Sequence, residues 1–410
     1  MLDRRSILKG LAILGPALTV PARLMAEGAD RATYGMIEIG ASGLKVAAYR
    51  FAPMAIAQDD GVGISGRERV MLGAEQFGKS YQINTSPISK LDKDRVQTAE
   101  LAAQAVLRLM GPDYRVPRSN ICIVASSGVA VVPGVIERLG PLILEKTQQA
   151  LALSGNGTVE GGIPMDAIDA EAESRLSFDW IVYAQRRRQV LLIDIGSGNT
   201  KGGYYENVGT CEQRFRGFAV PFGTKTLGNA IRDRWPNTQA AAHADEQFAG
   251  VVVPALNAEI ESAPGMVSKP RVYLAGGIIW ATAMLTRPEA MVSKANWVRL
   301  QSEDFEQLHR AIAGGKPYQY AGQLALPQKQ RDWLDLQLTK VAETFNDDQL
   351  ATGNAICRGL ARRLNLAQRS ALYFPTFAVN AWSSQYLLTK FRADAAETGI
   401  SSKPRNCART

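Results

Sequence analysis

Short apolar runs that end in small polar residues recur along this chain, and the clearest of them predicts a β-hairpin. Residues 190–195 are apolar except for Asp194, residues 196–199 read Gly-Ser-Gly-Asn, and an apolar pattern resumes through Tyr204 and Tyr205. A run of this length before a Gly-rich turn is typical of a buried strand that reverses into a second strand. We therefore expect a strand, a tight turn and a second strand here.

The same pattern occurs earlier, at residues 37–49. The matching positions, at one constant offset, are Glu38 with Asp194, Gly40 with Gly196, Lys45 with Lys201 and Tyr49 with Tyr205. An internal repeat of this kind indicates two similar structural units. We expect two facing lobes, each opened by such a hairpin, with an anion held between their turns.

The remaining periodicity alternates between strands and helices. Further strands are predicted at 61–65, 69–72, 120–125, 271–274 and 370–374. Helices are predicted at 96–110, 133–153, from 168, at 244–260, 278–285, 349–364 and 379–391, and residues 288–345 read as mostly helical. This alternation predicts an α/β fold. At 410 residues the chain is long enough for two domains.

The residues of the second hairpin turn suit an anion. Gly196 and Gly198 allow backbone N–H groups to point at a phosphate, Ser197 and Thr200 add hydroxyl donors, and Asp194 ends the strand with a carboxylate that can hold a divalent cation. Gly-rich hairpins also arise for turn geometry alone, and that alternative stays open for a single copy.

Two other strand ends carry small residues. Ser126 and Ser127 follow the strand at 120–125, and Gly276 and Gly277 follow the strand at 271–274. Ligands of α/β sheets bind at the carboxyl ends of strands, and a glycine pair that opens a helix can admit a phosphate. A simple strand-to-helix turn and close helix–sheet packing are the alternatives at these two places.

The first residues match an export signal. Arg4 and Arg5 precede an apolar run at 11–20 that is too short to be a permanent membrane anchor, and Ala22 or Ala26 offers a cleavage site. Residues 1–26 therefore resemble a twin-arginine signal peptide, with a short amphipathic helix as the alternative. We expect a periplasmic protein and the twin-arginine export machinery as a partner. ATP is scarce there, which favours phosphate hydrolysis or binding over a kinase.

Composition narrows the chemistry further. The net charge of +8 comes partly from the first 26 residues, so it suits an anionic substrate without requiring one, and no nucleic-acid partner is expected. Only His243 and His309 are present, which excludes a histidine-rich zinc site. The four cysteines lack metal-type spacing, and their disulfide status and a homodimer both stay open.

The order of these landmarks resembles the exopolyphosphatase and guanosine pentaphosphate phosphohydrolase family, within the actin, sugar-kinase and chaperone ATPase superfamily. The resemblance covers nearly all of residues 34–392. Its motifs are the two glycine hairpins, Ala125-Ser126-Ser127, Glu173-Ser174-Arg175-Leu176, Pro221-Phe222-Gly223 and Ala275-Gly276-Gly277. It implies two ribonuclease-H-like lobes around a cleft: lobe I at 33–166, joined by the helix 379–392, lobe II at 167–375, and a polar tail at 394–410.

The resemblance also implies roles for individual residues. Glu173 would be the catalytic glutamate that orients and deprotonates water, and Asp194, with Glu38, would bind Mg²⁺. The candidate phosphate-binding residues are Gly40, Ala41, Ser42, Gly43, Lys45, Ser126, Ser127, Gly196, Ser197, Gly198, Asn199, Thr200, Lys201, Gly276 and Gly277. The expected function is an exported, Mg²⁺-dependent phosphohydrolase that acts on polyphosphate or a phosphorylated nucleotide.

Three positions depart from the family pattern. Glu38 stands where aspartate is usual, Lys201 where glutamate is common, and Ala130 where an arginine that grips phosphate is common. Lys45 and Lys201 would bind phosphate in compensation, or would be ordinary solvent-exposed lysines. The departures motivate the alternative of a non-catalytic envelope protein that binds polyphosphate or nucleotide. A third hypothesis is an actin-like filament protein.

Overall fold

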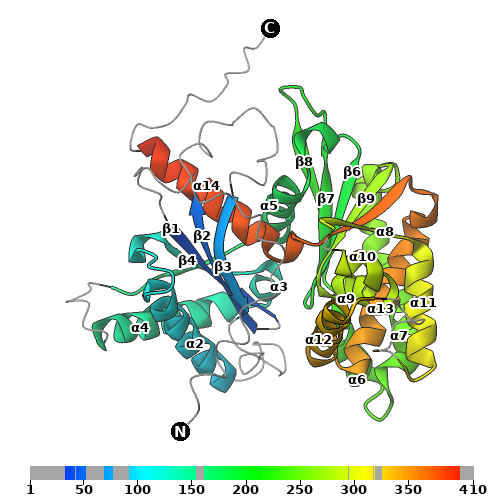
Figure 1. Cartoon of the computed structure of the whole chain (residues 1–410), viewed down its shortest axis with the longest axis horizontal. Coiled ribbons are helices and arrows are strands. Elements are labelled where there is room, and N and C mark those ends of the chain that lie inside the picture. Colours follow the sequence, from blue (N-terminus) through cyan, green and yellow to red (C-terminus); the bar gives the residue numbers. More distant parts are fainter. Residues whose placement is uncertain are drawn as a thin grey trace.

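The computed structural model describes residues 33–41, 43–51, 69–76, 92–153, 161–293, 295–316, 318 and 326–397 of the chain. The predicted signal peptide, the predicted strand at 61–65, Ser42 and the tail after residue 397 lie outside the described residues. Within them, the chain forms two sheets, each covered by helices (Figure 1).

The first sheet has the order β3-β2-β1-β4-β5. Its strands are β1 (Thr33–Gly40), β2 (Gly43–Phe51), β3 (Arg69–Gln76), β4 (Ile121–Ala125) and β5 (Met165–Ala167). The first three strands form an antiparallel meander, and β4 and β5 continue the sheet in parallel with β1. The repeated hairpin thus opens this sheet, as predicted from the sequence.

The second sheet has the order β10-β11-β9-β6-β7-β8. Its strands are β6 (Val190–Ile195), β7 (Thr200–Glu206), β8 (Arg214–Val220), β9 (Arg271–Ala275), β10 (Trp297–Leu300) and β11 (Ala371–Pro375). Strands β6 to β8 form a meander, and β9 and β11 follow in parallel with β6. Apart from the added edge strand β10, the second sheet repeats the first, so the fold prediction of two similar α/β lobes is confirmed.

Helices cover the outer face of each sheet. The first sheet carries α2 (Asp92–Met110), α3 (Ser127–Ala130) and α4 (Val135–Leu153). The second lobe contains α6 (Thr224–Arg234), α7 (Ala240–Gln247), α8 (Val253–Ser262), α9 (Gly277–Thr286), α10 (Pro288–Val292), α11 (Ser302–Ala313), α12 (Gln328–Thr344) and α13 (Asp347–Arg363). Each outer face packs its own hydrophobic core, in which alternate strand residues such as Ile37 and Ile193 are fully buried.

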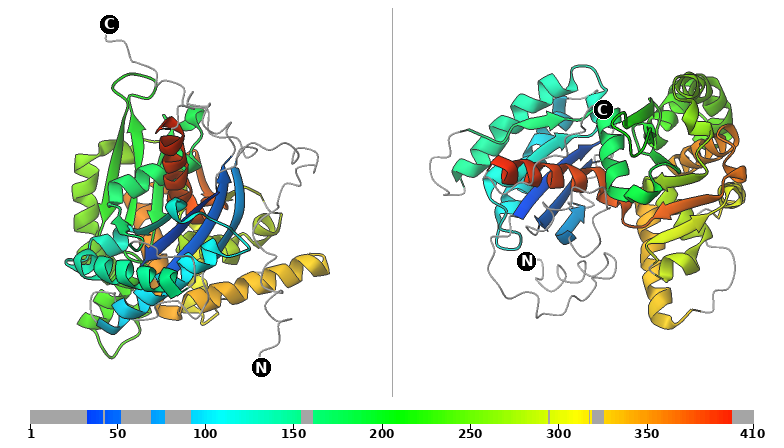
Figure 2. Two further views of the ribbon diagram at one scale, coloured as in Figure 1. Left: turned by 90° about the vertical axis from the view of Figure 1, so that its left-hand side faces the viewer. Right: turned by 90° about the horizontal axis from the view of Figure 1, so that it is seen from above.

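Two helices, α5 (Ala170–Ile181) and α14 (Ala381–Glu397), lie side by side between the sheets (Figures 1 and 2). A third core joins them to the inner faces of both sheets: Phe178 from α5 and Leu387 from α14 are buried with Met36 of β1 and Leu192 of β6. Large apolar side chains that exclude water on both sides make this layer a strong link between the lobes. Helix α14 contacts β1 and β2 of the first sheet as well as α5.

Two details differ from the sequence prediction. Residues 297–300 form strand β10, although the segment 288–345 reads as helical; the alternating pattern Trp-Val-Arg-Leu buries Val298 and Leu300 as it pairs with β11. Four residues are too few for their periodicity to stand out among helices. Helix α14 also continues to Glu397, past Asp394, where the sequence predicts a tail. Among the described helices, none is both long and apolar enough to cross a membrane.

Candidate functional site

Both repeated hairpins present an acid and a lysine on the inner face of their sheet. Met36 and Leu192 pack in the central core, and because strand side chains alternate, Glu38 and Asp194 two residues further on face the same layer. The register places Lys45 directly opposite Glu38, and Lys201 directly opposite Asp194. Residues that face each other across a strand pair lie on the same side of the sheet. The repeat therefore extends to an acid–lysine pair in each lobe.

Glu173 enters the same layer from the first turn of α5. Asp169 caps this helix by accepting a hydrogen bond from the Ala172 N–H, which fixes where the turn begins. Glu171 points to solvent and Glu173 is buried, so only one of the two glutamates reaches the site, as their spacing predicts.

Lys201 lies at the centre of this cluster. Its ammonium Nζ is 3.0 Å from Oε1 of Glu173, 3.3 Å from Oδ2 of Asp194 and 3.3 Å from Oδ1 of Asn199. The Lys201 side chain is 5% exposed. An ammonium has three N–H donors, and here three protein oxygens match them. The alternative of a solvent-exposed hairpin lysine is therefore excluded for Lys201.

Burial and charge oppose each other at Lys201. Loss of hydration by itself lowers the pKa of this lysine, but the nearby carboxylates of Asp194 and Glu173 outweigh that effect and raise its pKa above the ordinary value. Lys201 is therefore a permanent cation at neutral pH.

Lys45 is the corresponding lysine of lobe I. Its Nζ lies 2.8 Å from Oε1 of Glu38, and about a third of its side chain is exposed, in contrast to Lys201. Burial lowers its pKa, but attraction by Glu38, followed by Asp194 and Glu173, gives a net increase. The second carboxylate oxygen of Glu38, Oε2, is buried and accepts no hydrogen bond from the residues that the structure describes. Among these residues, Glu38 thus retains one buried acceptor.

The two lobes contact each other directly at this point. The backbone N–H of Ser127 donates to Oε2 of Glu173 at 2.8 Å, and the Asn199 side-chain amide donates to the Ser127 hydroxyl at 2.9 Å. A Cβ on Gly198 would lie 3.1 Å from Cα and O of Gly128, so only glycine permits this close approach without movement. Gly128 belongs to the same strand-end turn as Ser126 and Ser127, but the sequence analysis did not include it among the candidate phosphate-binding residues.

The other candidates surround this contact. Ser126 begins the turn after β4, and its N–H donates to the carbonyl oxygen of Ile39 in β1. Gly276 has a φ of +103°, and a Cβ there would lie 2.1 Å from the carbonyl oxygen of Ile195 and 3.0 Å from Oδ1 of Asp194. Only glycine fits at position 276, because of both the backbone conformation and the lack of space for a Cβ.

The turn after β6 is itself anchored to the helix that follows β8. The Thr200 hydroxyl donates to the carbonyl oxygen of Phe222, and the Gly196 N–H donates to the carbonyl oxygen of Asn199. The carbonyl oxygen of Ser197 accepts from the first turn of α6. Gly40, Ala41 and Gly43 form the matching turn between β1 and β2, and Gly277 begins α9. Of the candidate set, all but Ser42 lie in described positions.

Magnesium is the cofactor that the resemblance implies, and the contacts of the carboxylates test whether it fits. Asp194 and Glu38 each have one oxygen bound to a lysine ammonium, and both oxygens of Glu173 are engaged. Within the described ranges no set of three or more His, Cys, Asp or Glu side chains is arranged to hold a metal ion. At an effective dielectric constant of about 20, the Lys201 ammonium alone would contribute about 7 kcal/mol of repulsion to a Mg²⁺ ion about 5 Å away, and so offsets part of the attraction by the carboxylates. These residues do not fit a resident Mg²⁺ while Lys201 is in place.

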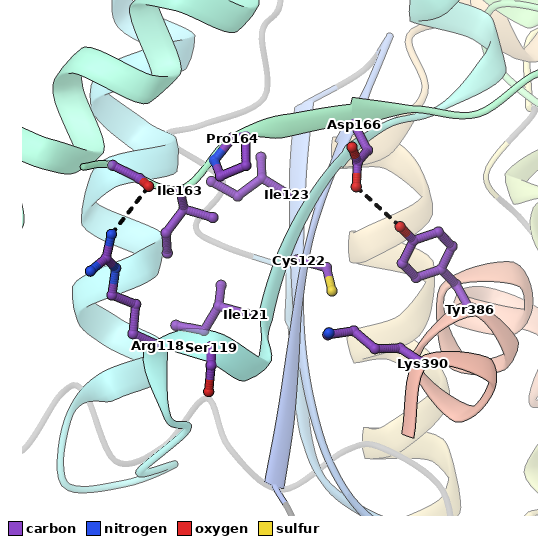
Figure 3. A pocket seen from close by; sticks show the side chains of 11 residues that line it. Arg118, Ser119, Ile121, Cys122, Ile123, Ile163, Pro164, Asp166, Tyr386 and Lys390 are labelled. Atoms are coloured by element: carbon purple, nitrogen blue, oxygen red, sulfur yellow. Dashed lines mark hydrogen bonds between the residues drawn. The ribbon is translucent and has the colours of Figure 1, made fainter. Parts of the chain in front are cut away.

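A separate pocket of about 350 Å³ lies on lobe I, beside the amino-terminal half of β4 (Figure 3). Cys122 lines it, and Tyr386 of α14 donates a hydrogen bond to Asp166 across its rim. The two cationic side chains that line the pocket are both hydrogen-bonded within the protein. Arg118 donates to the carbonyl oxygens of Gly161 and Gly162, and Lys390 donates to the carboxylate of Asp394. The candidate site lies instead at the carboxyl end of β4.

The paired sheets and the junction between their hairpin turns define an α/β protein of the actin-like ATPase fold. Solved structures agree with this class. The chain is similar to an exopolyphosphatase-like protein (TM-score 0.52, 13% identity, 87% of this chain and 98% of the other) and to an exopolyphosphatase from Cytophaga hutchinsonii (TM-score 0.50, 14% identity, 90% and 100%). It is also similar to the Ppx/GppA family member from Aquifex aeolicus (TM-score 0.50, 12% identity, 88% and 98%). No protein-family profile and no curated protein sequence matches the chain.

Proposed function

We propose that this protein is a phosphohydrolase that releases terminal phosphate from polyphosphate or a related phosphoanhydride. The observation that carries the proposal is the position of Glu173, which is held between the turns of both lobes by the Ser127 N–H and the Lys201 ammonium. The structural neighbours that are named exopolyphosphatases have the same fold and support this choice of substrate. A phosphorylated nucleotide is the related substrate class.

In the proposed reaction the protein forms no covalent bond to the substrate. Glu173 accepts a proton from water as the water oxygen bonds to the terminal phosphorus, and the bridging P–O bond breaks so that the shortened chain leaves on its oxygen. A carboxylate offers about four lone-pair positions, so the two hydrogen bonds to Glu173 fix its orientation and leave room for water. Lys45, which is partly exposed, supplies positive charge to the phosphate oxygens.

Phosphate release from long-chain polyphosphate tests this proposal. Glu173→Gln keeps the size of the side chain but removes its basicity, and should lower turnover by about a hundredfold or more. Glu171→Gln is the matched control, because Glu171 lies on the same helix and faces solvent. Equal turnover by the wild type and Glu173→Gln would reject hydrolysis at this site.

A non-catalytic binding protein is the second candidate, and the saturation of Lys201 by Glu173, Asp194 and Asn199 favours it. In that case the site holds a phosphate compound without turnover. Calorimetry with tripolyphosphate separates the two functions: binding without phosphate release supports the second candidate, and absence of binding rejects both.

We also propose that the protein is exported to the periplasm by the twin-arginine route. The proposal rests on Arg4 and Arg5 before the apolar run at 11–20. The double substitution Arg4→Lys, Arg5→Lys keeps the charge and removes the guanidinium pair, and should retain the precursor in the cytoplasm. Undiminished periplasmic protein in fractionated cells would contradict this assignment.

A further inference from the structure

Lys201 is coordinated in the way that proteins coordinate a small cation. Its three oxygen partners come from three different segments: Glu173 from α5, Asp194 from β6 and Asn199 from the turn before β7. Two of these partners are the residues that the sequence assigns to catalysis and to magnesium. The ammonium therefore lies between the carboxylate expected to activate water and one of the two carboxylates, Asp194 and Glu38, expected to bind Mg²⁺.

We propose that the Lys201 ammonium is a built-in cation that takes the place of a divalent metal ion between Glu173 and Asp194. A lysine on a strand carries its charge permanently, because it cannot dissociate from the site. The protein would then bind its phosphate ligand without a resident metal ion. The inference deepens the proposed function, and it rests on that function only for the identity of the ligand.

The repeat gives the inference independent support. Both hairpins place a lysine directly across from the acid near the end of the first strand, Lys45 opposite Glu38 and Lys201 opposite Asp194. The cluster of Glu38, Glu173, Asp194, Lys45 and Lys201 holds three carboxylates and two ammonium groups, a formal net charge of −1. Without Lys201 the same cluster carries −2 around a vacant position, which is the electrostatic condition of a divalent cation site.

Mn²⁺ is a suitable probe because its binding is read directly by electron paramagnetic resonance, without any turnover. The wild-type protein should show no Mn²⁺ site that depends on Asp194. Lys201→Ala should gain such a site, with Mn²⁺ binding at least about tenfold tighter than any shown by the wild type. Lys201→Glu should bind Mn²⁺ more tightly still, because it adds a carboxylate to those of Glu173 and Asp194. Adding Asp194→Asn to Lys201→Ala should remove the new site.

Lys45→Ala is the matched control, since it leaves the cluster with the same formal charge of −2 but keeps the Lys201 ammonium between Glu173 and Asp194. It should not create a Mn²⁺ site at Asp194. Circular dichroism confirms that each variant is folded before titration. If the Lys201 variants do not fold, the wild type still decides the matter: one tightly bound Mn²⁺ ion that Asp194→Asn abolishes would overturn the inference.

Binding of tripolyphosphate in the presence of EDTA gives a second measurement. The wild type should bind it with an affinity within about threefold of that measured in Mg²⁺, because the site cation belongs to the protein. Loss of binding in EDTA would contradict a built-in cation. If the protein binds tripolyphosphate in EDTA but does not release phosphate, the proposed hydrolysis is rejected and the inference of a built-in cation stands.

Discussion

Nζ of Lys201 lies 3.0 Å from Oε1 of Glu173, and the side chains of both residues are at most 5% exposed. In a charged pair that is buried to this degree, each charge stabilises the other. Removing one partner leaves the other charge unpaired in the protein interior, which is strongly destabilising. The carboxylate expected to activate water is thus paired with an ammonium group of the neighbouring hairpin. The stability and the chemistry of the site both depend on this contact.

Removal of Lys201 should destabilise the fold. Lys201→Met leaves the carboxylates of Glu173 and Asp194 buried without their shared cation, which should cost about 3–5 kcal/mol in the free energy of unfolding. Arg310→Met breaks a surface pair with Glu303 in which both side chains are 64% exposed, so it should cost less than about 1 kcal/mol. Urea unfolding measures both values, and equal costs would show that the buried cluster adds no stability.

The raised pKa values of Lys45 and Lys201 fix how this stability depends on pH. A lysine whose pKa is raised on folding stabilises fully below its unfolded pKa of about 10.4, and that contribution is lost as pH rises through the folded value. The difference in unfolding free energy between wild type and Lys201→Met should therefore be constant from about pH 6 to 9 and shrink above about pH 10.4. A difference that falls already between pH 6 and 9 would contradict the assignment.

Asp194→Asn should lower phosphate release, and added Mg²⁺ should not restore it. The substitution removes one of the two carboxylates that hold Lys201, so the ammonium moves closer to Glu173 and competes with water for its lone pairs. We expect a loss of about tenfold to a hundredfold. Turnover measured over a wide range of Mg²⁺ concentrations checks this, and recovery at high Mg²⁺ would mean that Asp194 binds the metal after all.

The cysteines should differ sharply in reactivity. Burial raises the pKa of the Cys122 thiol to about 11 and also raises that of Cys357, whereas Cys211 is exposed. The thiolate is the reactive form. In a Cys407→Ser background, iodoacetamide at about pH 8 should therefore label Cys211 first. Mass spectrometry reads the sites, and labelling of Cys122 at the rate of Cys211 would contradict the burial of that thiol.

The hairpins were the most predictable part of the fold. The local sequence predicts each hairpin, because an apolar run with an acid near its end is followed by a Gly-rich turn. The second copy of this pattern, at Glu38, made the arrangement in two lobes predictable as well. Strand β10 was missed because four residues at a sheet edge gain their structure from pairing with β11, which local periodicity does not reveal.

The sequence named Glu173, Asp194 and Lys201 as candidates, and the structure brings their side chains together. Their contacts were not predictable, because the sequence left Lys201 as a phosphate ligand or a surface lysine. Its burial follows from α5, which lies outside the hairpin and brings Glu173 over β7. Periodicity places Lys201 on a face of its strand, but only the tertiary packing shows what covers that face.

Phosphate release from long-chain polyphosphate, measured with and without EDTA, tests whether this protein hydrolyses phosphoanhydrides with a lysine in place of a metal ion. The protein should release phosphate in both conditions at rates within about threefold of each other, and Glu173→Gln should lower both rates by about a hundredfold. Release that requires Mg²⁺ and is abolished by EDTA would contradict the built-in cation. Absence of release in both conditions, with the protein folded, would contradict the proposed hydrolysis.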